Sequence, residues 1–160
     1  MTPRRSSERS DVELVTAAQA GDRAALDTLL YRHIDRIHAV CRRITGTAQD
    51  ADDATQEALL AIVRGLPRFD GRSAFGTWAY RIATNASLDE LRRRKRRPAL
   101  QVVDDDDDRR TSEPVDPRSH RHVDGVVERM SIDAALADLA PEFRTAVVLR
   151  DVADLDYAEI

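Results

Sequence analysis

Apolar residues recur every three or four positions between Leu26 and Ile44, which is the spacing of one buried helix face. The members of this face are Leu26, Leu29, Leu30, Ile34, Ile37, Val40, Cys41 and Ile44. Asp22 is placed to cap the start of such a helix, and Gly46 is placed to end it. The pattern predicts a long amphipathic helix, the clearest in the chain, and favours an all-α fold.

Shorter helical patterns flank this stretch. Ser10 and Glu13 have the spacing of a capping box, which predicts a short helix after Ser10. Its apolar members are Val12, Leu14, Val15 and Ala18. A third helix is expected over roughly Asp50 to Gly65. Its apolar members are Ala54, Ala58, Leu59, Ile62, Val63 and Leu66.

The first turns of the third helix carry acidic and amide side chains. Asp53, Gln56 and Glu57 lie at i, i+3 and i+4 and therefore share one face. Acidic residues near a helix N-terminus are stabilising by themselves, by about 0.3–1 kcal/mol each at the surface. The same face can also dock on a basic helical partner, and the residues alone leave both interpretations open.

The stretch from Phe69 to Arg97 joins a polar loop, a helical pattern and six consecutive cations. Ser73 is the expected N-cap of the helix. The expected buried stripe consists of Phe75, Trp78, Ala79, Ile82, Ala83 and Ala86. The expected opposite side consists of Thr77, Tyr80, Arg81, Thr84 and Asn85. Trp78 is expected to be half core and half wedge, and the opposite side carries groups that stack on bases or hydrogen-bond to them.

Such a helix followed by a cation run is typical of a surface for single-stranded or melting nucleic acid. Stacking on an aromatic ring contributes about 1–3 kcal/mol per base, and cations gain by releasing counterions from phosphates. A solvated helix end is the alternative explanation of the cations, but six in a row exceed what a helix dipole requires. The expected phosphate-binding residues are Arg92, Arg93, Arg94, Lys95, Arg96 and Arg97.

The net charge of −4 conceals an asymmetry between the two parts of the chain. Residues 1–97 hold 18 Lys/Arg and 13 Asp/Glu, a net of +5, whereas residues 98–160 hold 7 and 16, a net of −9. This split favours a nucleic-acid face in the first part. Residues 98–130, which include the run Asp104–Asp108, lack periodicity and are expected to form a flexible acidic linker.

Helical signals return after the linker. Ser131 is expected to cap a helix, and Pro141 suits the first turn of another. The apolar residues of these two helices are Ile132, Ala135, Leu136 and Leu139, then Phe143, Ala146, Val147 and Leu149. The final stretch, DVADLDYAEI, is expected to begin a helix-turn-helix, with its first helix starting at Asp154 and Leu155.

The expected organisation is a helical bundle with a small second domain. A disordered tail at 1–10 precedes a helical domain at 11–97. The linker at 98–130 then leads to an incomplete helix-turn-helix domain at 131–160.

Enzymatic and metal chemistry find little support in the sequence. His38 and Cys41 share an i, i+3 relation and His33 lies on the same helix, but no second ligand pair appears. A packed Cys41 and surface histidines are therefore expected, and no cofactor. The acidic residues Asp50, Asp52, Asp53 and Glu57 could hold Mg²⁺ as in a nuclease. No nucleophile or base accompanies them, so we expect no enzyme.

Cysteine usage and hydropathy indicate the compartment. The single cysteine fits a reducing cytoplasm. The first residues, MTPRRSSERS, lack the apolar segment of a secretory signal. Apolar runs are far shorter than the ~20 residues of a spanning helix. A cytoplasmic protein without membrane insertion is expected.

The stretch FDGRSAFGTWAYRIATNASLDELRRRKRR resembles region 2 of the bacterial extracytoplasmic-function (ECF) sigma factors. The preceding DADDATQEALLAIVRGL is similar to the part of that family that grips RNA polymerase. The later SIDAALADLAPEFRTAVVLRDVADLDYAEI is similar to the start of its region 4. The resemblance implies a transcription initiation factor that binds core RNA polymerase and recognises and melts the promoter −10 element.

The same resemblance implies residue roles. Binding to core polymerase, through the β′ clamp helices and the β subunit, would involve Asp52, Asp53, Gln56, Glu57 and Leu60. Contact with the −10 element would involve Phe69, Asp70, Ser73, Trp78, Tyr80, Arg81, Thr84 and Asn85. Among these, Asn85 and the 69–73 loop are the expected base readers.

Further implications concern the rest of the chain. An acidic linker in this family can thread the polymerase cleft, and an anti-sigma factor is an expected partner. The family has a recognition helix that would follow Ile160, so the chain is expected to be truncated within region 4.

The sequence is also compatible with two other functions. A helical protein-interaction adaptor would use its basic segment for acidic proteins, without sequence preference and without need of Tyr80 or Asn85. A nuclease would show metal-dependent cleavage that Asp52→Ala abolishes. If the protein is a sigma factor, Asn85→Ala is expected to weaken −10 binding and to leave polymerase binding intact.

Overall fold

The computed structural model describes residues 9–97 and 132–160, so the expected linker and Ser131 lie outside the described residues, as does most of the expected tail. In order, the elements are α1 (Asp11–Gln19), α2 (Arg23–Thr45), α3 (Ala48–Gly65), the 3₁₀ turn η1 (Leu66–Arg68), α4 (Phe75–Arg96) and α6 (Pro141–Asp151). Residues 132–137 are also helical, and no strand occurs in the two described ranges. The expected all-α class is confirmed.

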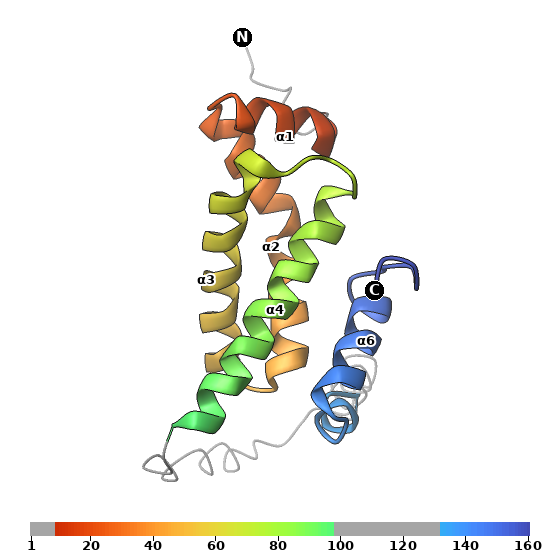
Figure 1. Cartoon of the computed structure of the whole chain (residues 1–160). Coiled ribbons are helices and arrows are strands. Elements are labelled where there is room, and N and C mark those ends of the chain that lie inside the picture. Colours follow the sequence, from red (N-terminus) through yellow and green to blue (C-terminus); the bar gives the residue numbers. More distant parts are fainter. Residues whose placement is uncertain (1–8, 98–131) are drawn as a thin grey trace, which may run out of the picture.

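Helices α2, α3 and α4 run alongside one another, and α1 lies across one end of them (Figure 1). The turn η1 and the loop after it cross that same end and lead into α4. Helix α4 therefore starts beside α1 and carries its basic C-terminal turn to the far end of the bundle (Figure 1).

Local sequence signals set most helix ends as expected. Ser10 and Glu13 form both hydrogen bonds of a capping box. The Asp22 side chain caps α2, and Gly46 ends it in a left-handed conformation with φ of 85°. Pro141 occupies the first turn of α6. Each of these signals acts within a few residues, which explains why the sequence alone predicts it.

Two expected helix starts were wrong. Helix α3 begins before Asp50, because the Thr47 hydroxyl accepts a hydrogen bond from the backbone N–H of Asp50 and so caps an earlier turn. Helix α4 begins at Phe75, with Ala74 in the cap position and no side-chain capping bond, so Ser73 does not cap it.

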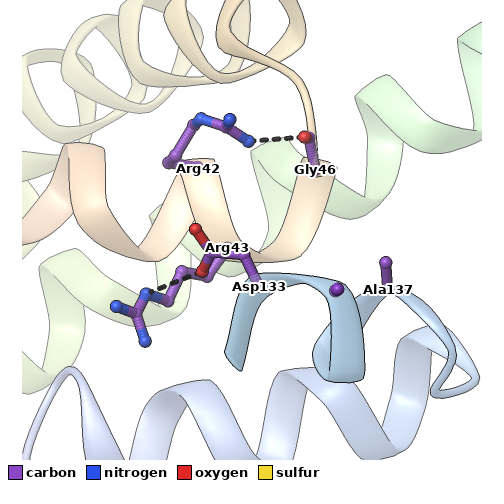
Figure 2. A pocket seen from close by; sticks show the side chains of 6 residues that line it. Arg42, Arg43, Gly46, Asp133 and Ala137 are labelled. Atoms are coloured by element: carbon purple, nitrogen blue, oxygen red, sulfur yellow. Dashed lines mark hydrogen bonds and ion pairs between the residues drawn. The ribbon is translucent and has the colours of Figure 1, made fainter. Parts of the chain in front are cut away.

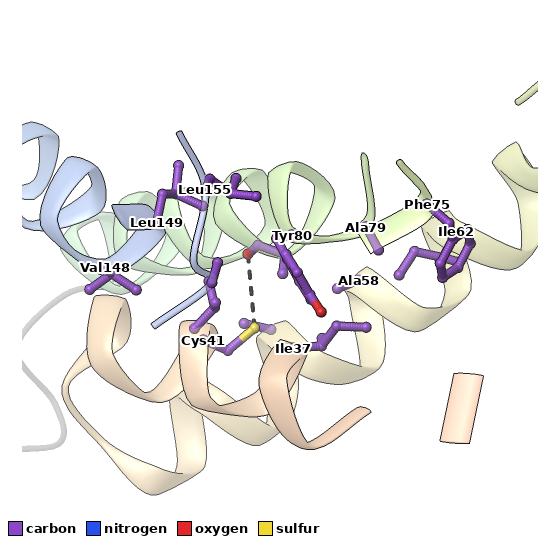
Figure 3. Packing of buried hydrophobic residues seen from close by; sticks show 14 of the residues in the cluster. Ile37, Cys41, Ala58, Ile62, Phe75, Ala79, Tyr80, Val148, Leu149 and Leu155 are labelled. Atoms are coloured by element: carbon purple, nitrogen blue, oxygen red, sulfur yellow. Dashed lines mark hydrogen bonds between the residues drawn. The ribbon is translucent and has the colours of Figure 1, made fainter. Parts of the chain in front are cut away.

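The core forms where small residues of α3 and α4 let these helices approach larger side chains of α2 (Figure 3). Helix α2 contributes the buried side chains Leu29, Ile37, Val40, Cys41 and Ile44. The facing residues of α3 and α4 are Ala51, Ala54, Ala58, Ile62, Ala79 and Ala83. Full burial of a leucine or isoleucine contributes about 1.5–3 kcal/mol, so this seam is the main source of stability.

The C-terminal part packs on the same bundle, against α2 and α4. Val148, Leu149 and Leu155 are buried and belong to the core cluster (Figure 3). Arg144 Nη1 donates to the carbonyl oxygen of Ile44 at 2.8 Å. This carbonyl lies in the last turn of α2, where backbone acceptors lack intrahelical partners.

An ion pair and a shallow pocket mark the edge of this contact. Arg43 Nε lies 3.6 Å from Asp133 Oδ1 (Figure 2). The pocket beside the pair has a volume of about 240 Å³. It is lined by Arg42, Arg43, Gly46, Asp133, Ala134 and Ala137.

Two expectations for the C-terminal part were wrong. Phe143 and Val147 are 69 % and 39 % exposed, whereas Val148 and Leu149 face the bundle, because contact with α2 and α4 selects a different side of α6. Residues 152–160 form turns, so no helix begins at Asp154, whose φ of 58° is left-handed.

Candidate nucleic-acid interface

The loop between η1 and α4 is shaped by its own side chains. Asp70 Oδ1 accepts a hydrogen bond from the backbone N–H of Arg72 at 3.1 Å, and Asp70 Oδ2 lies 3.1 Å from Arg72 Nε. Gly71 has a φ of 72°, which glycine adopts without the steric penalty of other residues. The loop is therefore a tight turn that exposes Asp70 and Arg72 just before α4.

Three aromatic rings meet beside this loop. The ring centroid of Phe69 lies 4.9 Å from that of Trp78 and 6.1 Å from that of Phe75. Phe75 is buried, and Phe69 and Trp78 are half-buried, as expected for Trp78. A Cβ atom on Gly65 would lie 3.0 Å from Cζ2 of Trp78, so the glycine makes room for the indole. Anchored but partly accessible rings can stack against a base.

The expected solvent-facing side of α4 was partly wrong. Arg81 and Asn85 are exposed, but Thr77, Tyr80 and Thr84 are 4 %, 4 % and 6 % exposed. Helix α4 packs against both α2 and α3, so it buries a wider arc than one apolar stripe. Tyr80 and Thr84 are thus not accessible to DNA in this arrangement.

The exposed side of α4 forms a continuous stripe. Trp78, Arg81, Asn85 and Arg92 follow one another at intervals of three, four and seven residues, which places them on one helix face. The first is half-buried beside the loop and the other three are exposed. At a rise of about 1.5 Å per residue the stripe is roughly 21 Å long. It leads from the aromatic cluster to the cations.

A buried polar network holds Tyr80 in place. The Tyr80 hydroxyl lies 2.8 Å from His33 Nδ1, and His33 Nε2 lies 2.7 Å from Asp11 Oδ2. Because a carboxylate only accepts, the Nε2 of a neutral His33 carries the proton, and its Nδ1 accepts from Tyr80. Burial raises the pKa of Tyr80, so the phenol stays protonated. The surface position expected for His33 was wrong.

The C-terminal segment covers part of the same side of α4. The Thr77 hydroxyl donates to Glu159 Oε1 at 3.0 Å. Arg81 donates through Nε, at 3.0 Å, and through Nη2 to the carbonyl oxygen of Glu159. A backbone hydrogen bond from Asp156, with the one from Thr77, holds the pKa of Glu159 below its usual value. The charged Glu159 therefore sits against Arg81, which was expected to contact DNA, and against Thr77, which was expected on the same side of the helix.

The basic end of α4 is exposed throughout, from Arg92 to Arg97. Three of its cations contact acidic side chains. Arg92 lies 2.7 Å from Asp89 and Arg93 lies 3.3 Å from Glu90, both one turn earlier. Arg94 lies 2.7 Å from Asp50 at the start of α3. The Arg92–Asp89 pair is exposed on both sides and contributes little to stability, so Arg92 can exchange its partner for a phosphate. Glu90 and Asp50 are largely buried, so they hold Arg93 and Arg94 more firmly.

The outer face of α3 is separate from this stripe. Its inward residues are buried alanines and Ile62, whereas Asp53, Gln56, Glu57 and Leu60 are exposed on one strip. Leu60 is 47 % exposed. Asp52 is also exposed, and its Oδ1 lies 3.1 Å from His38 Nε2. The residues expected to bind polymerase are therefore accessible together.

Cys41 and His38, the candidate metal ligands of the sequence, have other partners in the structure. Cys41 is buried, its thiol donates to the carbonyl oxygen of Ala83 at 3.8 Å (Figure 3), and burial raises its pKa. His38 contacts Asp52 rather than Cys41. Within residues 9–97 and 132–160, no three His, Cys, Asp or Glu side chains converge as metal ligands.

No helix of the described parts is long and apolar enough to span a membrane.

Comparisons with known proteins agree with the sequence resemblance. The family model of sigma-70 region 2 matches residues 29–97. SigM of Mycobacterium tuberculosis, an ECF RNA polymerase sigma factor, is 38 % identical over 152 residues, which cover 95 % of this chain and 72 % of SigM. The RNA polymerase sigma-H factor of Pseudomonas aeruginosa is 32 % identical, over 96 % of this chain and 82 % of that protein.

Two solved structures are similar in fold. An engineered region 2 of sigmaE in complex with GTAAAA has a TM-score of 0.54 and 32 % identity, and it covers 62 % of this chain and 100 % of that one. CnrH in complex with the cytosolic domain of CnrY has a TM-score of 0.64 over 93 % of this chain and 79 % of CnrH. Its identity of 22 % supports likeness of fold alone.

Most of α2, all of α3 and α4, the loop with its aromatic cluster and the basic helix end lie in the segment that the family model matches. The relatives of 38 % and 32 % identity extend the likeness over almost the whole chain. The chain therefore belongs to the ECF RNA polymerase sigma factors, transcription initiation factors that recognise the promoter −10 element.

Proposed function

We propose that this sigma factor captures an unpaired non-template base of the −10 element with the 69–73 loop and the first turn of α4. The observation that carries the proposal is the exposed stripe of α4, which begins at half-buried Trp78 and continues through Arg81 and Asn85 to Arg92. Aromatic, cationic and amide groups lie along it, a combination that suits a strand of bases and phosphates.

Base capture helps to offset the free energy of opening the duplex. Each stacked step lost costs about 1.4 kcal/mol, and an extruded base that stacks on aromatic side chains and hydrogen-bonds to polar ones recovers part of that loss. Phe69 and Trp78 supply the apolar wall. Asp70, Ser73 and Asn85 supply the groups for hydrogen bonds.

The burial of Tyr80 and Thr84 changes the expected set of DNA contacts. These two residues support α4 from inside the bundle, whereas Phe69, Asp70, Ser73, Trp78, Arg81 and Asn85 remain the proposed contacts. The solved complex of an engineered sigmaE region 2 with GTAAAA supports a nucleic-acid ligand for this part of the fold.

The cations from Arg92 to Arg97 are proposed to bind the phosphates next to the captured base. They follow the stripe directly and are exposed. Binding of single strands then gains free energy from released counterions and weakens as salt rises.

Core polymerase is proposed to bind the outer strip of α3. Asp53, Gln56 and Glu57 give this strip a negative and amide character, and exposed Leu60 adds an apolar contact. Asp52 lies beside it. The resemblance to the family supplies the partner, the β′ clamp helices with the β subunit nearby, and the exposure of the strip supports that assignment. An anti-sigma factor is a further proposed partner. A cytoplasmic location is also proposed, because core polymerase and promoter DNA are the proposed partners.

The first experiment separates the two proposed surfaces. The full chain is mixed with core polymerase that lacks other sigma factors, and binding to fluorescent non-template −10 strands is measured. Asn85→Ala should weaken strand binding about two- to tenfold, the value of one hydrogen bond, with polymerase affinity unchanged. Glu57→Arg should weaken polymerase affinity instead. Thr16→Ala and Glu142→Arg change exposed residues outside both surfaces and serve as controls.

The outcomes distinguish the sigma function from the adaptor alternative. Sequence-selective strand binding that depends on Asn85 supports the proposal. A folded protein that binds neither core polymerase nor any −10 strand favours a protein-interaction adaptor. Equal strand binding by the Asn85→Ala variant means that another residue reads the base.

A further inference from the structure

Gln19, the last residue of α1, bridges two backbone carbonyls at the entrance of the 69–73 loop. Its Nε2 donates to the carbonyl oxygen of Leu66 at 2.9 Å and to that of Phe69 at 2.8 Å. We propose that Gln19 is a positioning residue for −10 recognition, which holds the loop in the conformation that captures the base. The inference rests on the proposed role of this loop.

The two acceptors lie where the backbone needs support. Leu66 and Phe69 bracket η1, and the Leu66 carbonyl also accepts from the Phe69 N–H at 3.1 Å. A carbonyl at the end of such a turn has no further partner within the turn. The side-chain amide of Gln19 carries two N–H donors, one for each oxygen. Its two bonds thus fix the peptide planes on both sides of the turn.

The fixed peptide directs the aromatic cluster. Phe69 has an extended backbone, with φ of −67° and ψ of 120°, and its ring lies 4.9 Å from Trp78. A rotation of the peptide after Phe69 would move this ring and also Asp70, the next residue. Gln19 therefore acts through Phe69 on the wall of the proposed base pocket.

Helix α1 is itself held firmly, which gives the bridge a rigid support. The capping box at Ser10 fixes its start, and Asp11 contacts His33 at 2.7 Å. Leu14 and Val15 are buried in the core. Gln19 itself is exposed, so its substitution leaves the apolar core intact.

The Gln19 bridge is expected to strengthen base recognition because it holds the loop in its binding conformation before the strand binds. A loop already in its binding conformation does not lose conformational freedom when the strand arrives. A loop without the bridge binds the preferred base less tightly, while phosphate contacts on the basic helix end stay as they are. The expected result is a loss of base selectivity rather than of all strand binding.

The test compares base enrichment by several variants of the full chain with core polymerase. The probe is a pool of single-stranded oligonucleotides with six randomised positions, and the bound fraction is sequenced. Gln19→Ala and the isosteric Gln19→Glu both remove the donors. Gln19→Lys restores donors to the same position. Thr16→Ala is the control, since the Thr16 hydroxyl contacts only the Val12 carbonyl of its own helix.

The wild type should enrich preferred bases at one or more positions. Gln19→Ala and Gln19→Glu should lower that enrichment about five- to tenfold, as expected for two hydrogen bonds, and Gln19→Lys should restore part of it. Enrichment is a ratio between sequences bound by the same sample, so a smaller folded fraction does not alter it. Trp78 is the sole tryptophan, and its emission should shift in the donorless variants.

Each result has a distinct meaning. Equal enrichment by the wild type, Gln19→Ala and Gln19→Glu overturns the positioning role, even if these variants are less stable. No enrichment by the wild type contradicts the proposed function of the loop. Loss of enrichment in Thr16→Ala as well as in the Gln19 variants would assign the effect to α1 in general and not to the bridge.

Discussion

The hydroxyl of Tyr80 lies 2.8 Å from Nδ1 of His33. This contact joins α4 to α2, and His33 in turn contacts Asp11 of α1. Tyr80 is buried, so its role is structural in this arrangement. A residue that the sequence pattern assigned to a DNA face is instead part of the support behind that face.

Tyr80→Phe should therefore reduce stability without changing base selectivity. The substitution removes one buried hydrogen bond and leaves the His33 nitrogen without its partner, at a cost of about 1–3 kcal/mol. Urea unfolding measures the change in free energy, and the randomised-strand pool measures selectivity. A variant with unchanged stability but lost selectivity would restore Tyr80 to the DNA contacts.

Asp11→Asn should make the free energy of unfolding less dependent on pH in the acidic range. Partial burial raises the pKa of Asp11, but His33 and Arg32 together outweigh burial and bring that pKa below its ordinary value of 3.8. A carboxyl with a lowered folded pKa stabilises the protein above its unfolded pKa, and this contribution disappears as pH falls through the folded value. The wild type should lose stability below about pH 4, and the variant should lose less. Urea unfolding at several pH values provides the measurement, and equal slopes would contradict it.

Gly65→Ala should disturb the aromatic cluster from outside the loop. The new Cβ would lie 3.0 Å from Cζ2 of Trp78, a contact so tight that the indole is expected to shift by a few tenths of an ångström relative to Phe69. Tryptophan emission should change, and strand selectivity should fall several-fold. Arg64→Ala, one residue earlier and exposed, should leave both unchanged. An unaltered emission spectrum in Gly65→Ala would show that the backbone of α3 shifts and the indole keeps its position.

The contrast between these residues explains which features the sequence could predict. The caps at Ser10, Asp22 and Gly46 depend on neighbours within a few residues, so their patterns are visible in the chain. The burial of Tyr80 depends on α4 having two packing partners, which a single helical stripe cannot reveal. Gln19 meets carbonyls 47 and 50 residues away, and no local spacing encodes that distance.

The same distinction holds for the candidate site. The exposure of Arg81, Asn85 and the cation run follows from local spacing and was predicted. The sequence pattern placed Trp78 and Asn85 on opposite sides of the helix, whereas both lie on the stripe. Glu159 contacts Thr77 and Arg81, which lie 82 and 78 positions earlier in the chain. The acidic charge of Glu159 is visible in the sequence, but its position beside α4 is not.

Glu159→Ala should increase the affinity of the free chain for single strands. The substitution removes the carboxylate that accepts from Thr77 and loosens the segment whose carbonyl holds Arg81. Since a hydrogen bond and a nearby negative charge are lost together, an increase of about two- to fivefold is expected. Glu142→Ala removes the same charge from an exposed position on α6 and should have a smaller effect. Fluorescence anisotropy measures both, and equal affinities would mean that the segment does not compete with DNA.

The cations at the end of α4 should determine how salt affects strand binding. For single strands, the slope of log affinity against log salt changes by about 0.7 for each phosphate contact. A double variant, Arg96→Ala with Arg97→Ala, should therefore reduce the slope by up to about 1.4 and weaken all sequences alike. The matched control, Arg23→Ala with Arg64→Ala, removes two exposed cations elsewhere and should change the slope little. Anisotropy titrations over a range of salt concentrations give both slopes. The two double variants remove the same charge, and only the first removes the proposed phosphate contacts. An equal reduction of the slope in both would therefore assign the salt effect to the net charge of the chain.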